Sequence, residues 1–147
     1  IVNKPAAGMA LGDLLHQLDL QAHGPAHTAP VYFGGPVETA RGFVLHTCDY
    51  QSRLKTLNVG EDFGMTATLD VLEDIAQGLG PARAQVMLGY AGWGPDQLEG
   101  EIARNGWLTA AAHPDLVFGP QDEDKWMEAV KSMGIDPLGL SGAAGRA

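Results

Sequence analysis

An almost unbroken apolar run at residues 85–91, QVMLGYA, is the strongest hydrophobic feature of the chain. Its length is that of a β-strand, and the lack of alternating polar residues is typical of a strand that is covered on both faces. Gly89, Gly92 and Gly94 allow a sharp turn after it. Pro95 suits the first position of a helix, where its missing N–H needs no partner. The pattern predicts a central strand followed by a turn into a helix.

The segment after this turn has the pattern of a short amphipathic helix. Leu98 and Ile102 lie one helical turn apart, and Gly106 is placed to be the residue that follows the last turn. Residues 107–112 are again mostly apolar and have the length of a strand. The pattern therefore predicts a strand–helix–strand crossover over residues 84–112.

Periodicity and turn residues predict the other elements of a mixed sheet with flanking helices. The strands expected are a strand end at 1–3 that Pro5 stops, two strands at 31–34 and 42–47 joined by a loop or a wide hairpin, an edge strand at 57–59 and a strand at 63–68. The helices expected are one that buries Leu11, Leu14, Leu15 and Leu18, one at 69–77 that buries Leu72, Ile75, Ala76 and Leu79, a helical turn at 116–118, and one at 123–133 with Asp122 as its N-cap and Trp126, Val130 and Met133 on its apolar face. A tail from Gly139 is predicted to be mobile. Two crossovers that share the strand at 84–91 predict parallel pairing there, and the hairpin adds an antiparallel pair. The fold class expected is α/β, with one compact domain.

Four ordered motifs carry a resemblance to a known family. They are Asn3-Lys4-Pro5, VYFGGPV at 31–37 followed by GFVLH at 42–46, GYAGWGPDQLEGEI at 89–102, and GIDP at 134–137 with LS at 140–141. Together they resemble the YqgE/AlgH family over nearly all of the chain. The resemblance implies a single YqgE/AlgH-like domain over residues 1–147 with a bifurcated, partly barrel-like mixed sheet. It also implies a regulator, because the family name refers to regulation of alginate production. No reaction is attached to the family.

The resemblance also bears on the first residues. In the family, the Asn-Lys/Arg-Pro element follows an N-terminal segment of strand–helix–strand character. Ile1 is therefore expected to lie in the middle of a strand, with that segment missing here.

Charge and composition narrow the classes of partner. The 18 acidic and 9 basic residues give a net charge of −9 and a pI near 4.7, which repels phosphate backbones. The basic residues form no run, so direct DNA binding is disfavoured. A single cysteine cannot form an internal disulfide, and no apolar stretch reaches the length of a membrane span. A cytoplasmic protein without membrane contact is expected, and a homo-oligomer stays open.

No motif predicts a catalytic centre, a cofactor or a metal site. Gly92 and Gly94 lack the third glycine of the dinucleotide-binding motif, and no Gly-Lys-Ser/Thr follows them. Pro95 removes one donor, and Asp96 and Glu99 place negative charge where a phosphate would bind. The glycines are predicted to shape a turn, and the sequence favours a non-enzymatic protein.

Three functional hypotheses remain open. The first is a cytoplasmic regulator that acts through protein–protein contacts, with an interaction surface formed by motif residues that a periodic core does not need: Asn3, Lys4, Gly34, Gly35, Pro36 and Trp93. The second is a small-ligand-binding protein or enzyme with a cleft near His46 and Cys48, which would share one face of an extended strand. The third, a DNA-binding regulator, is disfavoured by charge. Trp93 is either a plug over the sheet edge or an exposed anchor, and the usual burial of large aromatic residues favours the plug.

Overall fold

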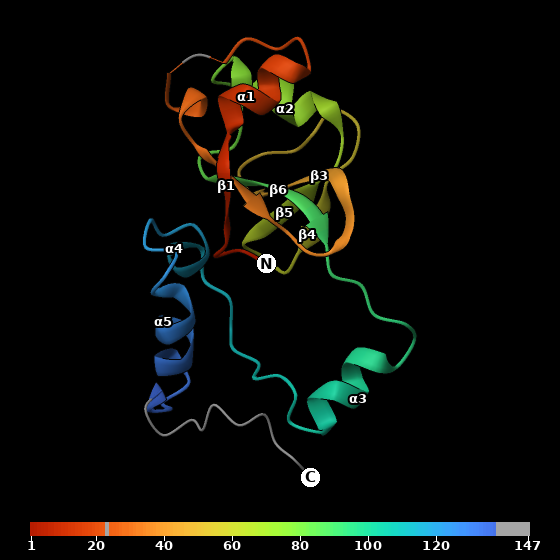
Figure 1. The fold of residues 1–147 in the computed structure, drawn as a ribbon, viewed down its shortest axis with the longest axis vertical. Helices are drawn as coiled ribbons and strands as arrows, with labels where there is room; N and C mark the ends of the chain where they lie inside the picture. Colours follow the sequence, from red (N-terminus) through yellow and green to blue (C-terminus); the bar gives the residue numbers. More distant parts are fainter. Residues whose placement is uncertain (23, 138–147) are drawn as a thin grey trace. The chain divides into compact units, whose positions relative to one another are not determined.

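A computed structural model of the chain describes residues 1–22 and 24–137 (Figure 1). The chain divides into two compact units, Ile1–Ala91 and Gly92–Ala147, of which only the residues given above are described. The first carries the whole β-sheet and the helices α1 and α2, and the second carries α3, α4 and α5. The expectation of one domain over residues 1–147 stays a prediction. The predicted tail from Gly139 and the motif at 140–141 lie outside the described residues.

Six strands form one mixed sheet in the order β1-β2-β6-β3-β5-β4. Their bounds are β1 Pro5–Ala10, β2 Pro30–Phe33, β3 Val37–Thr47, β4 Leu57–Val59, β5 Phe63–Thr66 and β6 Ala84–Tyr90. Since β1 and β4 are edges of this order, the sheet is open and is not closed into a barrel. The mixed α/β sheet expected from the sequence is confirmed.

The apolar run at 85–91 forms β6, which lies inside the sheet as predicted. It pairs in parallel with β2 through Val31 and Val86, and antiparallel with β3 through Val44 and Val86. Of the two connections that the sequence left open between β2 and β3, the wide hairpin is wrong, because β6 lies between these two strands, and a loop joins them. The connection from β2 to β3 therefore passes over the end of β6 instead of forming a turn between neighbours.

Three glycines allow this connection to pass close to β6. A Cβ atom on Gly35 would lie 2.2 Å from the carbonyl carbon of Tyr90, and one on Gly34 would lie 2.2 Å from the carbonyl oxygen of Gly89. Gly89 itself has a φ of +75°, and a Cβ there would lie 2.4 Å from the carbonyl oxygen of Gly35. These contacts join backbone to backbone, so no side-chain rotation can make room for a methyl group.

One face of the sheet is covered by α1, Leu11–Gln17, and α2, Leu69–Ala76. The core on that face is formed by Leu11, Leu15, Val31, Val44, Tyr50, Val71, Ala76 and Val86. The segment β5–α2–β6 is a crossover, because β5 and β6 both run antiparallel to β3, which lies between them. This first predicted crossover is confirmed, although its two strands are not neighbours. Leu79 was expected in the core but is 67% exposed.

The first residues differ from their prediction. The strand begins at Pro5, where it was expected to end, and Ile1 lies outside any strand. A proline is tolerated as the first residue of an edge strand because no ladder hydrogen bond needs its missing N–H. Residues before it still follow β2: the amino group of Ile1 donates to the Gly34 carbonyl at 2.7 Å, and the Phe33 N–H donates to the Lys4 carbonyl at 2.8 Å.

The second unit contains α3 Gln97–Ala103, α4 Pro114–Val117 and α5 Lys125–Ser132. Residues 107–112 form no strand, so the second predicted crossover is wrong. The reason lies in the side chains: Trp107 and Leu108 are about half exposed, and Thr109 is followed by three alanines, which have little preference for strands.

Two helices of the second unit, α3 and α5, start later than predicted, whereas α4 starts earlier, at Pro114. Helix α3 begins at Gln97 after Asp96, so Pro95 does not occupy its first position. Helix α5 begins after Asp124, whereas the predicted cap Asp122 accepts a hydrogen bond from the buried Lys125 ammonium at 2.6 Å. Trp126 was expected on the buried face but is 54% exposed.

Candidate functional site

Two tryptophans and a glutamate form a compact cluster around α3, which we call the Trp–Glu cluster: Trp93, Trp107 and Glu101. The indole rings of Trp93 and Trp107 meet edge to face with their centroids 5.8 Å apart. Both indole N–H groups donate to the same oxygen of Glu101, at 3.2 Å from Trp93 and 2.6 Å from Trp107. The two rings are nevertheless 38% and 49% exposed. The cluster therefore presents two aromatic side chains to solvent in a fixed orientation.

The two ends of α3 place the tryptophans beside Glu101. At the C-terminal end, the Asn105 N–H donates to Ile102 and the Gly106 N–H donates to the Glu101 carbonyl, with Asn105 at a φ of +59°. This is a Schellman motif, and it turns the chain so that Trp107 lies against the last turn. Gly106 was predicted at the position that Asn105 occupies.

At the N-terminal end, Gln97 connects the turn to the cluster. The Gly94 N–H donates to the Gln97 side-chain oxygen at 3.0 Å, and the Gln97 amide donates to the second oxygen of Glu101 at 2.9 Å. The hydrogen bond from Trp107, followed by those from Gln97 and Trp93, lowers the pKa of Glu101 below its usual value. Glu101 therefore remains an anion over a wide pH range.

The predicted interaction surface is brought together only in part. Asn3 and Lys4 run beside the end of β2, and Lys4 is exposed with its ammonium 4.9 Å from the centre of the Phe33 ring. Pro36 is exposed, but Gly34 and Gly35 are buried against the backbone of β6. Trp93 belongs to the other compact unit and contacts Trp107. Whether these residues serve an interaction stays a prediction.

His46 is fully buried on the face of the sheet that α1 and α2 cover. Its Nδ1 donates to the Thr47 carbonyl at 2.8 Å, and its Nε2 lies 3.0 Å from the Thr66 hydroxyl. The Thr66 hydroxyl in turn lies 2.9 Å from that of Thr56. Gly64 provides the space for the imidazole, since a Cβ there would lie 2.4 Å from its Cε1. These contacts satisfy both ring nitrogens, so the imidazole has a structural role.

Cys48 is exposed and lies just beyond the end of β3, so it does not share the strand face on which His46 lies. The neighbouring Thr47 hydroxyl donates to Asp49, which lowers the pKa of that carboxyl. Neither His46 nor Cys48 lines the clefts found in the described residues. A thiol–imidazole site at this place has no support from the geometry.

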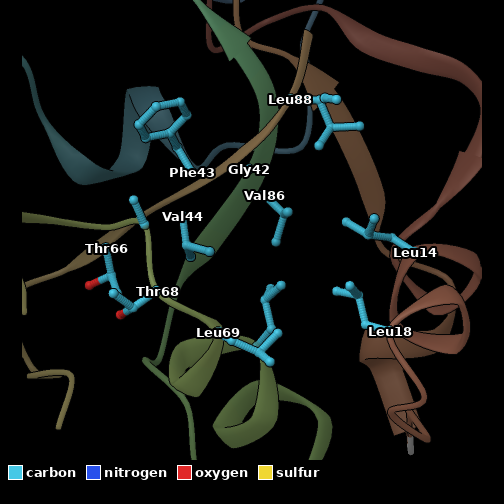
Figure 2. A pocket seen from close by; sticks show the side chains of 13 residues that line it. Leu14, Leu18, Gly42, Phe43, Val44, Thr66, Thr68, Leu69, Val86 and Leu88 are labelled. Atoms are coloured by element: carbon cyan, nitrogen blue, oxygen red, sulfur yellow. The ribbon is translucent and has the colours of Figure 1, made fainter. Parts of the chain in front are cut away.

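An apolar cleft lies instead between α1, α2 and the sheet (Figure 2). Its volume is about 240 Å³, and it is lined by Leu14, Leu18, Ala40, Gly42, Phe43, Val44, Thr66, Ala67, Thr68, Leu69, Leu72, Val86 and Leu88. None of these residues is charged. The only polar side chains are two threonines at one end, and both hydroxyls are engaged in hydrogen bonds within the protein.

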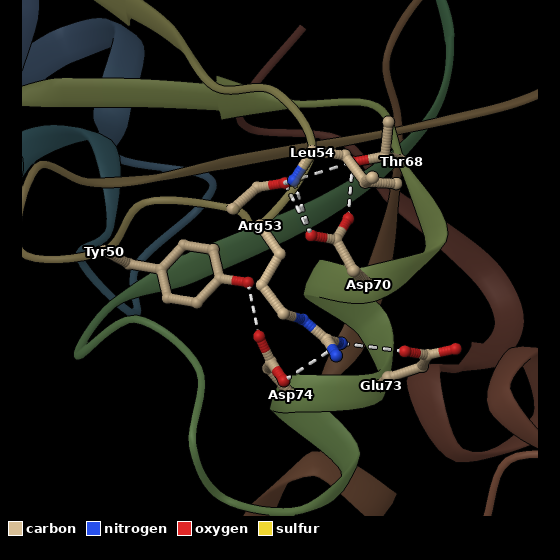
Figure 3. Close-up of polar contacts among 8 residues, drawn as sticks. Tyr50, Arg53, Leu54, Thr68, Asp70, Glu73 and Asp74 are labelled. Atoms are coloured by element: carbon tan, nitrogen blue, oxygen red, sulfur yellow. Dashed lines mark hydrogen bonds and ion pairs between the residues drawn. The ribbon is translucent and has the colours of Figure 1, made fainter.

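A polar clamp, formed by Tyr50, Ser52, Arg53, Asp70 and Asp74, holds the loop after β3 onto α2 (Figure 3). Asp70 accepts from the Ser52 hydroxyl at 2.6 Å and from the Thr68 hydroxyl at 2.5 Å, and the Leu54 N–H points at it at 3.3 Å. The Tyr50 hydroxyl donates to Asp74 at 2.6 Å. Arg53 bridges Asp74 and Glu73.

The clamp changes two ionisation equilibria. Burial opposes ionisation of Asp70, but the hydrogen bonds from Ser52, Thr68 and Leu54 outweigh it, and the pKa of Asp70 is lowered. Burial, and then the hydrogen bond to the Asp74 carboxylate, raise the pKa of Tyr50. The clamp thus favours a neutral Tyr50 and an ionised Asp70.

Within residues 1–22 and 24–137, the part of the chain that the structure describes, no group of three or more His, Cys, Asp or Glu side chains is arranged to hold a metal ion. None of the helices in this part of the chain has both the length and the apolar character needed to cross a bilayer.

Comparison with known proteins gives a consistent result. The AlgH-like family, a domain of unknown function, matches residues 1–138. The chain belongs to the AlgH-like family. A "UPF0301 protein" of Ruegeria pomeroyi is 59% identical over 148 residues, which covers all of this chain and 80% of the relative. A second, from Jannaschia, is 54% identical and is covered over 77% of its length.

Solved structures agree with this AlgH-like assignment. The solution structure of the AlgH protein of Pseudomonas aeruginosa has 39% sequence identity and a TM-score of 0.76, with 99% of this chain and 77% of that chain covered. A crystal structure of protein DIP2367 from Corynebacterium diphtheriae has 19% identity and a TM-score of 0.67 over 93% of this chain, and it supports the fold alone. The family resemblance inferred from the four motifs is confirmed, and it names no reaction.

Only part of the site in this AlgH-like chain is predictable from sequence: the prediction includes Trp93 but not its partners Glu101 and Trp107. Trp93 lies eight residues before Glu101 and Trp107 six residues after it, and neither spacing is the three or four residues that make side chains neighbours on a helix. The Asn105-Gly106 pair at the end of α3 is the signal that would have indicated a chain reversal toward the helix.

Proposed function

We propose that the protein acts without a reaction of its own, as a cytoplasmic regulator that binds another protein through the Trp–Glu cluster. The single observation that carries this proposal is the exposure of two tryptophans whose orientation is fixed by a shared carboxylate. Tryptophan is enriched among the residues that dominate binding energy at protein interfaces. Ordering a free tryptophan on binding costs conformational entropy, and the hydrogen bonds to Glu101 have already met most of that cost.

Charge supports a protein as the partner. A net charge of −9 disfavours nucleic acid, because affinity for phosphate backbones comes chiefly from Lys and Arg. The family comparison supports a regulatory setting only through the AlgH name of the Pseudomonas aeruginosa protein. A direct DNA-binding role remains disfavoured.

Affinity capture from an extract of the producing cells tests the proposal. Trp93→Ala is expected to weaken retention of the specific partner by about ten-fold or more, since truncation of a central interface tryptophan costs about 2 kcal/mol. Retained proteins are compared by quantitative mass spectrometry. Trp126→Ala is the matched control, because Trp126 is also exposed but lies on α5 outside the cluster. Equal retention by the wild-type protein and Trp93→Ala would contradict the proposal.

The apolar cleft favours a second function, binding of a small uncharged molecule. An apolar cavity of about 150 Å³ is known to stay dry and bind benzene. The cleft here has a volume of about 240 Å³ and is lined without charge, so it has room for a single aromatic ring or a short alkyl group.

Blocking the cleft tests this second function. Ala40 lines the cleft and is exposed, so a large side chain can enter from there without overpacking the core. Ala40→Phe is expected to abolish the shifts that benzene causes in the methyl NMR signals of Leu72 and Leu88. Thr39→Phe, one residue away and not part of the lining, is expected to leave them unchanged. Equal shifts in both variants would rule out binding in this cleft.

A further inference from the structure

The charge around the Trp–Glu cluster indicates what kind of partner it fits. The segment at 92–108 carries Asp96, Glu99 and Glu101 against a single basic residue, Arg104. The two indole faces are electron-rich, and the carboxylate between them is an anion. Each of these features attracts a cation, and the acidic surroundings add to the attraction.

Glu101 also retains the capacity for a further hydrogen bond. A carboxylate offers about four lone-pair sites. Two indole N–H groups and the Gln97 amide donate to Glu101. A cationic donor that reaches the carboxylate would lie against the indole rings at the same time.

We propose that the Trp–Glu cluster is a docking site for an arginine side chain on a basic segment of the partner protein. This inference rests on the proposed function and names the chemistry of its partner. A guanidinium group is planar, stacks on aromatic faces and is less strongly hydrated than an ammonium, so it fits a corner of two indoles better than lysine does. Its N–H groups can donate to Glu101 while its plane covers an indole.

Titration of the full chain with a Trp-free peptide of repeated Gly-Arg-Ser tests the inference. The peptide is expected to shift the indole N–H NMR signals of Trp93 and Trp107 in a saturable manner and to leave Trp126 unchanged. The same peptide with citrulline in place of every arginine is neutral but keeps the planar shape, and it is expected to cause no shift. Equal shifts by both peptides, or no shift by either, would overturn the inference.

Variants separate the site from general electrostatic attraction. Trp93→Ala, followed through the Trp107 signal, is expected to weaken binding about two- to five-fold, as for one exposed cation–π contact. Glu101→Gln keeps an acceptor for the indoles and removes the charge, and it is expected to weaken binding more than Glu99→Gln, which makes the same charge change on the same helix. If Glu101→Gln and Glu99→Gln weakened peptide binding equally, the proposed arginine site would be wrong.

The two proposals fail in different ways. If Trp93→Ala loses the captured protein but the arginine peptide does not shift the indole signals, the proposed function stands and the arginine site is wrong. If the peptide binds as expected but capture does not depend on Trp93, the arginine site stands and the proposed function is wrong.

Discussion

Replacing Gly35 with alanine is expected to destabilise the protein by about 3 kcal/mol, near the upper end of the range for overpacking a well-packed site. The added Cβ would lie 2.2 Å from the carbonyl carbon of Tyr90 and 2.4 Å from the Ala91 nitrogen. These are backbone atoms at the end of the central strand, so relief requires β6 or the connection from β2 to move. Urea unfolding at neutral pH measures the change.

Gly42→Ala is the matched control for this prediction. Gly42 lies on β3 and pairs with Leu88 of β6, but a Cβ there would meet only the Leu88 side chain, at 4.0 Å. Alanine in a strand loses less conformational entropy on folding than glycine, so this variant is expected to be neutral or more stable by about 0.5 kcal/mol. If Gly35→Ala behaved like Gly42→Ala, the close passage of the connection over β6 would be wrong.

The same glycines show why part of the fold could not be predicted. Hydrophobic periodicity located β6, β5 and α2 nearly to their ends, because burial of a face depends on residues close in sequence. The pairing of β2 with β3 was wrong, because the insertion of β6 between them depends on a contact with residues about 50 positions later in the chain. Gly34 and Gly35 are predicted on a surface because a periodic core does not need them. The structure requires them instead where the connection from β2 to β3 passes over the backbone of β6.

The error at 107–112 has a different origin. The apolar residues there predict a strand by their length alone, because alanine is a poor strand former and the segment has no alternation of apolar and polar residues. Trp107 instead turns back to Glu101 through the Schellman motif at the end of α3. For the second hypothesis, His46 and Cys48 were expected on one face of a strand, but β3 ends at Thr47 and only His46 lies in it. The end of a strand is set by tertiary contacts, so the two-residue spacing of His46 and Cys48 does not show whether both lie in the same strand.

Replacing Asp70 with asparagine is expected to destabilise the protein by about 3 kcal/mol at pH 7, because hydrogen bonds to a charged group contribute about 1.5–3 kcal/mol each. Asp70 is 5% exposed and accepts from Ser52, Thr68 and Leu54. An asparagine keeps the shape but presents one NH₂ group where an acceptor is needed. Glu73→Gln is the control on the same helix. It breaks only the partly exposed ion pair with Arg53, so it is expected to destabilise the protein by only about 0.5 kcal/mol.

The pH dependence of this difference tests the role of the charge. The pKa of Asp70 is lowered in the folded protein, so its ionised form adds stability above the ordinary carboxyl pKa, and that stability is lost as the pH falls through the folded value. Unfolding free energies of the wild-type protein and Asp70→Asn should therefore converge as the pH falls below about 4, since the unfolded carboxyl titrates near 3.9. A difference that stayed constant over this range would mean that Asp70 acts by shape alone, and the polar clamp would then not depend on an ionised carboxylate.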